Sequence, residues 1–149
     1  MALSAIFAFL HHLAAFALVA ALAVEFVLIR GELTLANARS LQRADIVYGI
    51  AAGAILIIGF LRVFYFEKGA EYYFSSHTFL TKVTVFAIVG LISIIPTIEF
   101  FSWRKGVAQG NVPVVAPAKL RRLRMIIHIE LAGIVVILLC AALMARGIG

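Results

Sequence analysis

The sequence is poor in charge, has a single cysteine and contains three prolines, and these scarcities exclude several classes of protein. Only 13% of its 149 residues are charged, whereas soluble domains have about 25%. Cys140 is the only cysteine, so no intrachain disulfide can stabilise a secreted scaffold. Hydrophobic residues make up 64% of the chain, against about 45–50% in soluble proteins. These values exclude a disordered segment, a coiled coil and an ordinary cytosolic enzyme, and they indicate a small integral membrane protein.

Four long apolar segments account for this composition. They cover residues 3–29, 45–66, 79–103 and 125–145. Each is close to or above the about 20 residues that a helix needs to cross about 30 Å of hydrocarbon. No Lys or Arg precedes the first segment, and it is too long for the apolar core of a signal peptide, so we expect a mature helix. The sequence therefore predicts an all-α, integral membrane four-helix bundle that forms one domain over residues 1–149.

Basic residues are concentrated in the first and third connections between these segments. Nine basic residues lie there: Arg30, Arg39, Arg43, Arg104, Lys105, Lys119, Arg121, Arg122 and Arg124. At the opposite ends of the segments, the connections and termini contain only Lys68 and Arg146. The positive-inside rule then predicts that the basic connections are cytoplasmic and that both termini lie outside. The net charge of +6 therefore does not indicate nucleic-acid binding, for which the chain has no soluble basic domain.

Ionisable side chains inside the apolar segments are candidate functional residues, because each costs about 2.5–3.5 kcal/mol on insertion scales. We divide them by depth into two layers. The outer layer, near the expected outer face, consists of His11, His12, Arg62 and Lys82, with His77 in the adjoining loop. The inner layer, beside the basic connections, consists of Glu25, Asp45, Glu99, His128 and Glu130. For the inner layer we expect a structural role, in which Glu99 or Glu130 pairs with an arginine of the third connection.

Helical phase distinguishes the two adjacent histidines. His11 and Glu25 are separated by nearly four helical turns and share one face, whereas His12 points about 100° away. His11 also lies about 12 Å inside its segment, which is too deep for an imidazole to reach the head groups easily. If Glu25 faces the bundle interior, His11 faces it as well. We therefore expect His11 to bind a ligand inside the bundle.

The ligand that this histidine favours is a b-type haem, which helical bundles often hold through axial histidines. His11 would be the metal ligand, with His12 in reserve. Lys82 would be the second ligand, which requires a neutral amine, or a partner of a propionate or substrate. Arg62 would pair with a propionate, although Arg62 and Lys82 also lie close enough to helix ends to extend to the lipid head groups. His11 and Lys82 are accordingly the candidate catalytic residues.

Two other cofactor classes fit less well. Covalent c-type haem is excluded because the sequence has no Cys-x-x-Cys-His motif. Copper is the rival metal, but Cys140 and the three methionines Met1, Met125 and Met144 are a poor set of soft ligands. Haem b therefore remains the favoured cofactor.

Two features of the apolar segments bear on helix packing. Gly49 and Gly53 form a small-xxx-small pattern, which predicts close helix packing within the bundle or between copies in a homo-oligomer. Pro96 is expected to kink the third segment near its end.

Over nearly its full length the chain resembles an uncharacterised bacterial family of four-helix inner-membrane proteins. The resemblance rests on the stretches Leu10-His11-His12 and Arg62-Val-Phe-Tyr-Phe-Glu-Lys68, on Lys82 through Gly90-Leu-Ile-Ser to Pro96-Thr97, and on Met144-Ala-Arg-Gly147. It implies a location in the bacterial inner membrane, where the outward termini expected from the positive-inside rule would lie in the periplasm.

More distantly, the chain is similar to HemJ-type protoporphyrinogen oxidases and CopD-like copper-resistance proteins. Matched by position, their first-helix histidine falls on His11 or His12, their third-helix lysine on Lys82 and their fourth-helix acid on Glu130. The chain departs from the HemJ pattern in having Leu80 two residues before the lysine, and Ile129 before the acid. The resemblance implies haem b binding and the oxidation of a porphyrin.

Three functions remain open at this point. The first is a haem-binding redox protein that oxidises a porphyrin or exchanges electrons with quinone. The second is a CopD-like metal-handling or transport protein. The third is a structural membrane subunit without a cofactor.

Overall fold

The computed structural model describes residues 2–66 and 69–148, and the regular structure in this part of the chain is helical. Four helices there are long and apolar enough to cross a membrane. They are α1 (Ala2–Leu28), α2 (Leu35–Leu61), α4 (His77–Ser102) and α6 (Pro117–Ala145). The prediction of an all-α bundle with four membrane-spanning helices is thus confirmed.

Three short elements complete the described part of the chain. A π-helical turn, η1 (Arg62–Phe66), continues α2 at its C-terminus. The helix α3 (Ala70–Phe74) precedes α4, and α5 (Arg104–Ala108) follows it after Trp103. The connections between the long helices are therefore partly helical themselves.

Two long helices begin earlier than hydropathy predicts. The α2 helix begins at Leu35 rather than at residue 45, because the Thr34 hydroxyl accepts a hydrogen bond from the Asn37 amide at 3.1 Å and caps the helix. The α6 helix begins at Pro117 rather than at residue 125, with proline in the first turn, where its missing N–H costs nothing. Apolar length marks where a helix enters hydrocarbon, whereas the helix itself continues into the basic region.

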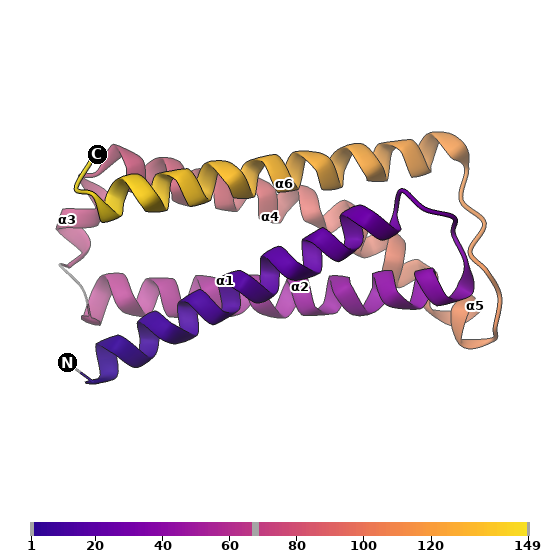
Figure 1. Cartoon of the computed structure of the whole chain (residues 1–149), viewed down its shortest axis with the longest axis horizontal. Helices are drawn as coiled ribbons and strands as arrows, with labels where there is room; N and C mark the ends of the chain where they lie inside the picture. The colour runs from indigo at the N-terminus through magenta and orange to yellow at the C-terminus, as the bar shows by residue number, and fades with distance from the viewer. Residues whose placement is uncertain (1, 67–68, 149) are drawn as a thin grey trace.

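The four long helices form two antiparallel hairpins (Figure 1). The α1 helix packs mainly along α2, and α4 packs mainly along α6. The hairpins meet through smaller contacts, of α1 with α6 and of α2 with α4. Both termini lie at the same end of the bundle, opposite α5 (Figure 1). This arrangement places the outer layer at the end with the termini and the inner layer nearer the basic connections.

The buried core is thin and lies along the line where the hairpins meet. Its fully buried side chains include Leu22, Leu41, Phe100 and Ile127, one from each long helix. Only 17–28% of each spanning window is buried within the chain. Large apolar side chains such as Phe16 therefore face outward, as expected of helices surrounded by lipid.

A tight helix contact occurs at a glycine outside the predicted pattern. A Cβ atom at Gly133 of α6 would collide with the side chain of Val89 on α4. At Gly49 and Gly53, by contrast, an added Cβ atom would meet nothing within 4 Å. The α4–α6 hairpin therefore uses Gly133 for close packing, and the Gly49–Gly53 face is open.

The α4 helix continues through Pro96 and ends at Ser102. Pro96 is buried, so its ring packs within the bundle instead of facing lipid. The residue therefore lies inside a continuous helix and does not end it.

Candidate functional site

The outer layer brings together residues from different parts of the chain. His11 lies on α1, Arg62 begins η1 at the end of α2, and Lys82 lies in the second turn of α4. Arg62 and Lys82 are both close enough to His11 to interact with its ring electrostatically. Three residues that the sequence singled out separately therefore form one group at the end of the bundle that carries the termini.

The imidazole of His11 is half-buried and packs against the α2 backbone. Its Nδ1 atom is buried and has no hydrogen-bond partner among the described residues. A Cβ atom at Gly59 would lie 3.5 Å from Cε1 and 3.8 Å from Nδ1 of this ring. The imidazole therefore lies against α2 at Gly59, where a methyl group would just touch the ring and a larger side chain would compete with it for space.

His12, in contrast to His11, faces away from the bundle. Its side chain is exposed, and its Nδ1 atom lies 2.6 Å from the carbonyl oxygen of Ala8, one turn earlier in the same helix. The two histidine rings meet edge to face with their centroids 6.2 Å apart. The helical phase thus places His11 inward and His12 on the outer surface of α1.

Aromatic side chains line the outer layer. Phe7 and Phe66 stack with their centroids 4.6 Å apart and connect α1 to η1. The ammonium group of Lys82 lies 5.3 Å from the centroid of Phe79, one turn earlier on α4. A half-buried Lys82 with an aromatic neighbour is held near the bundle, whereas His77, at the start of α4, is exposed.

Some residues of the predicted patterns cannot be placed. Lys68, one of the two basic residues expected on the outer side, lies outside the described residues. Met1, one of the methionines considered as copper ligands, lies outside them as well.

A metal site made only of protein side chains is not found in the described parts of the chain. No group of three or more His, Cys, Asp or Glu side chains in residues 2–66 and 69–148 is arranged to hold a metal ion. The outer layer offers His11 and, as a neutral amine, Lys82. Such a set suits a metal that already carries most of its ligands.

The inner layer contains a carboxyl cluster, formed by Glu25 of α1, Asp45 of α2 and Glu130 of α6, which the sequence did not identify as a unit. Glu25 is 2% exposed and Glu130 is 1% exposed. The three carboxyl groups are close enough to act on one another electrostatically. The periodicity of a single helix predicts which of its faces is buried. It does not predict which residues of three helices meet at one depth, because that depends on how the helices pack together.

Hydroxyl groups surround this carboxyl cluster. The Thr97 hydroxyl donates to Asp45 Oδ1 at 2.7 Å. The Tyr48 hydroxyl lies beside Glu130 and Ser93. One oxygen of Glu25 and one of Glu130 nevertheless have no hydrogen-bond partner among the described residues. The cluster is therefore polar, buried and incompletely satisfied.

The predicted pairing of Glu99 or Glu130 with an arginine is wrong in its details. Glu99 pairs with Lys119 at 3.1 Å and accepts a hydrogen bond from the Trp103 indole at 3.0 Å. Arg124 instead donates to the carbonyl oxygen of Ile29 at 2.8 Å. That carbonyl follows the last turn of α1, where helix acceptors are unsatisfied and a cation is stabilised. The arginine therefore binds the end of α1, and the buried Glu130 has no ionic partner among residues 2–66 and 69–148.

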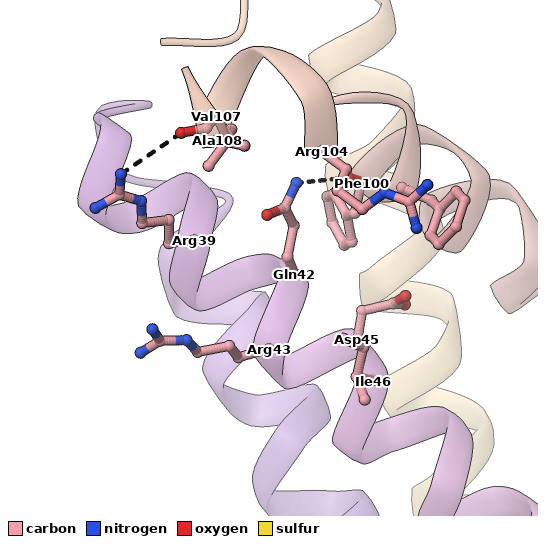
Figure 2. A pocket seen from close by; sticks show the side chains of 10 residues that line it. Arg39, Gln42, Arg43, Asp45, Ile46, Phe100, Arg104, Val107 and Ala108 are labelled. Carbon is pink, nitrogen blue, oxygen red and sulfur yellow. Dashed lines mark hydrogen bonds between the residues drawn. The ribbon is translucent and has the colours of Figure 1, made fainter. Parts of the chain in front are cut away.

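A groove of about 400 Å³ lies between α2 and the α4–α5 junction, beside the carboxyl cluster (Figure 2). Gln42 crosses it and donates to the carbonyl oxygen of Phe100 at 2.9 Å. Arg39 donates to the carbonyl oxygen of Val107 at 3.5 Å. In Figure 2 the side chain of Asp45 points away from those of Arg39 and Arg43. Asp45 is thus the member of the cluster that also lines this groove.

Comparison with known proteins gives a family and no more. Neither the curated proteins nor the solved structures contain a match to the chain. The similarity to HemJ-type and CopD-like proteins therefore finds no support there. A family model described as "Predicted membrane protein (DUF2214)" matches residues 3–149. With this match and its four candidate spans, the chain belongs to the DUF2214 family of predicted membrane proteins.

Proposed function

We propose that this protein binds haem b and acts as a redox protein of the bacterial inner membrane, with His11 as an axial ligand. The observation that carries the proposal is the inward-facing imidazole of His11, whose buried Nδ1 atom has no hydrogen-bond partner among the described residues. Porphyrin nitrogens occupy four positions around the iron, so the protein needs to supply one or two ligands. The outer layer has that number of suitable side chains.

The other residues of the outer layer have complementary roles in this proposal. Lys82 is the second ligand when its amine is neutral, and otherwise binds a propionate or a substrate carboxylate. Arg62 provides a cation for a propionate, with its fixed planar donors. Phe7 and Phe66 contribute an aromatic wall that limits water near the site. Bound haem b would supply one-electron chemistry, for which a porphyrin or a quinone is the proposed partner.

The proposed topology places the outer layer on the periplasmic side. The basic connections lie at the end opposite the termini, and the positive-inside rule assigns them to the cytoplasm. Reporter fusions at Gly110 and at Gly149 should therefore report cytoplasm and periplasm, respectively. A cytoplasmic signal at Gly149 would overturn this orientation.

An absorption spectrum tests the cofactor directly. Protein purified after haem-replete expression should show a Soret band, and α and β bands on reduction. His11→Ala should lose most of the Soret band. His12→Ala should retain it, because the exposed His12 ring already faces the carbonyl of Ala8. Full haem occupancy in both variants, or no haem in the wild type, would overturn the proposal.

Metal analysis of the same samples separates the remaining alternatives. Bound copper without a Soret band would favour a CopD-like metal-handling protein. Protein with neither metal nor haem would favour a structural subunit.

A further inference from the structure

The carboxyl cluster of Glu25, Asp45 and Glu130 poses an electrostatic problem that the haem proposal does not use. Burying a carboxylate costs several kcal/mol unless a cation or several hydrogen-bond donors compensate it. Neither Glu25 nor Glu130 forms an ion pair with a cation of residues 2–66 or 69–148. Three like charges at this depth would also repel one another strongly. Burial and mutual repulsion therefore disfavour a cluster in which all three groups are charged, and favour neutralisation by protons or by a cation.

The side chains around the cluster come from every helix packed against it. Tyr48 joins Glu130 from α2, and Thr97 and Ser93 face it from α4. Arg124 on α6 donates to the carbonyl oxygen of Ile29. His128, also on α6, is exposed and stacks on Phe26 with centroids 6.1 Å apart. The surroundings of Glu25 and Glu130 are thus hydroxyl-rich, whereas Asp45 shares its groove with the cations of Arg39, Arg43 and Arg104.

Asp45 connects this cluster to the groove between α2 and the α4–α5 junction. It is only half-buried, whereas Glu25 and Glu130 are fully buried. It also lines the groove, and its carboxylate points away from Arg39 and Arg43 (Figure 2). Asp45 is therefore the member of the cluster that can exchange a proton with water in the groove.

We propose that Glu25, Asp45 and Glu130 form a proton-holding relay inside the bundle, which exchanges protons with water through Asp45. At rest Glu25 and Glu130 carry protons. In release, the O–H bond of Glu130 breaks, its electron pair stays on the Glu130 oxygen, and the proton passes to one bridging water molecule, which gives one of its own protons to a carboxylate oxygen of Asp45. Asp45 then passes the proton to water, which becomes hydronium, and loading is the reverse. The proposed topology places this exchange on the cytoplasmic side.

Two observations favour protons over a metal cation as the positive species. The cluster is not arranged to hold a metal ion, since no group of that kind occurs in the described residues. The groove beside it is lined by Arg39, Arg43 and Arg104, which repel a diffusing metal cation. A proton, in contrast, can be delivered by a neutral water molecule or a weak acid.

Infrared difference spectroscopy on the purified full chain tests the relay without reference to haem. The wild type should show the carbonyl stretch of protonated carboxyls, with a downshift in D₂O. Glu25→Gln and Glu130→Gln should each remove part of this band. Glu99→Gln is the matched control, because Glu99 is paired with Lys119 and should contribute nothing to the band.

The rate of hydrogen–deuterium exchange at the same band tests the role of Asp45. Asp45→Asn keeps the shape of the side chain and removes its proton-accepting carboxylate. We expect exchange of the buried carboxyl protons to slow by about a hundredfold, the scale of a positioned proton-transfer group. Unchanged exchange in a folded Asp45→Asn protein would show that protons enter by another route.

The wild-type spectrum alone can overturn the proposal, even if a buried variant does not fold. Absence of a protonated-carboxyl band would mean that the cluster is ionised and does not hold protons. Loss of the band when sodium chloride replaces choline chloride would identify a cation site instead. Neither outcome depends on haem binding, so the relay and the proposed function succeed or fail separately.

Discussion

The side chain of Val89 on α4 occupies the space that a Cβ atom would take at Gly133 on α6. This contact fixes the distance between the two helices of the second hairpin. Val89 is buried, and Ile134, next to Gly133, belongs to the same core. The packing of α4 on α6 therefore includes one contact that leaves no room for a side chain at position 133.

Enlarging Gly133 should consequently destabilise the bundle. Gly133→Ala requires Val89 or the helix backbone to shift, and overpacking of this kind costs about 1–3 kcal/mol. The measurement is the free energy of unfolding in detergent. Gly90→Ala is the control, since a Cβ atom there meets nothing within 4 Å and should be tolerated. Equal stability of the two variants would show that α4 and α6 do not approach closely at Gly133.

The two polar contacts near the basic connections should differ in how much they stabilise the protein. Glu99→Gln breaks an ion pair whose lysine is 56% exposed, so its cost should stay below about 1 kcal/mol. Arg124→Gln removes a charged donor from the part-buried carbonyl of Ile29 and should cost about 1–3 kcal/mol. The free energy of unfolding in detergent, measured for both variants, checks this order. A larger loss of stability in Glu99→Gln than in Arg124→Gln would contradict it.

The contact of Gly59 with His11 gives a test of the haem site that leaves the ligand intact. Gly59→Ala places its Cβ atom at ordinary contact distance from the ring, 3.5 Å from Cε1, and should keep the Soret band. Gly59→Leu should displace the imidazole and reduce haem occupancy. Equal Soret absorbance in the two variants would mean that the ring position at Gly59 does not matter for the cofactor.

The open glycine face of α2 predicts self-association. Among the described residues, an added Cβ atom at Gly49 or Gly53 meets nothing within 4 Å, and small residues of this kind are common at membrane helix interfaces. Gly49→Ile with Gly53→Ile should convert a homo-oligomer to monomers, measured as mass in mild detergent. Gly90→Ile is the matched control on α4. A monomeric wild type would contradict the prediction.

The fold was predictable from sequence because hydropathy reports directly on membrane-spanning length. Helical phase also predicted that His11 faces inward, since a single helix determines that relation. The starts of α2 and α6 were not predictable in this way, because Thr34 and Pro117 act on the backbone outside the apolar segments. Hydropathy therefore located the membrane segments better than the helices.

Relations between helices were harder to predict. Glu99 pairs with Lys119 and not with an arginine, because Arg124 reaches the end of α1. The meeting of Glu25 with Asp45 depends on the same mutual packing, for which a single sequence contains no direct signal. Grouping the inner layer by depth placed these residues at one level, but it did not show that Glu25, Asp45 and Glu130 meet in a buried polar cluster.

The division into two hairpins has a consequence for biosynthesis. Each hairpin makes its main contacts within itself, so it can leave the translocon and enter the bilayer as an independent unit. The α1–α2 unit is completed first, and the α4–α6 unit docks onto it through the α1–α6 and α2–α4 contacts. Both the outer-layer group and the carboxyl cluster contain residues from each hairpin, so neither exists before docking. Two fragments divided between the hairpins and produced together should therefore assemble both sites, while either fragment alone should contain neither.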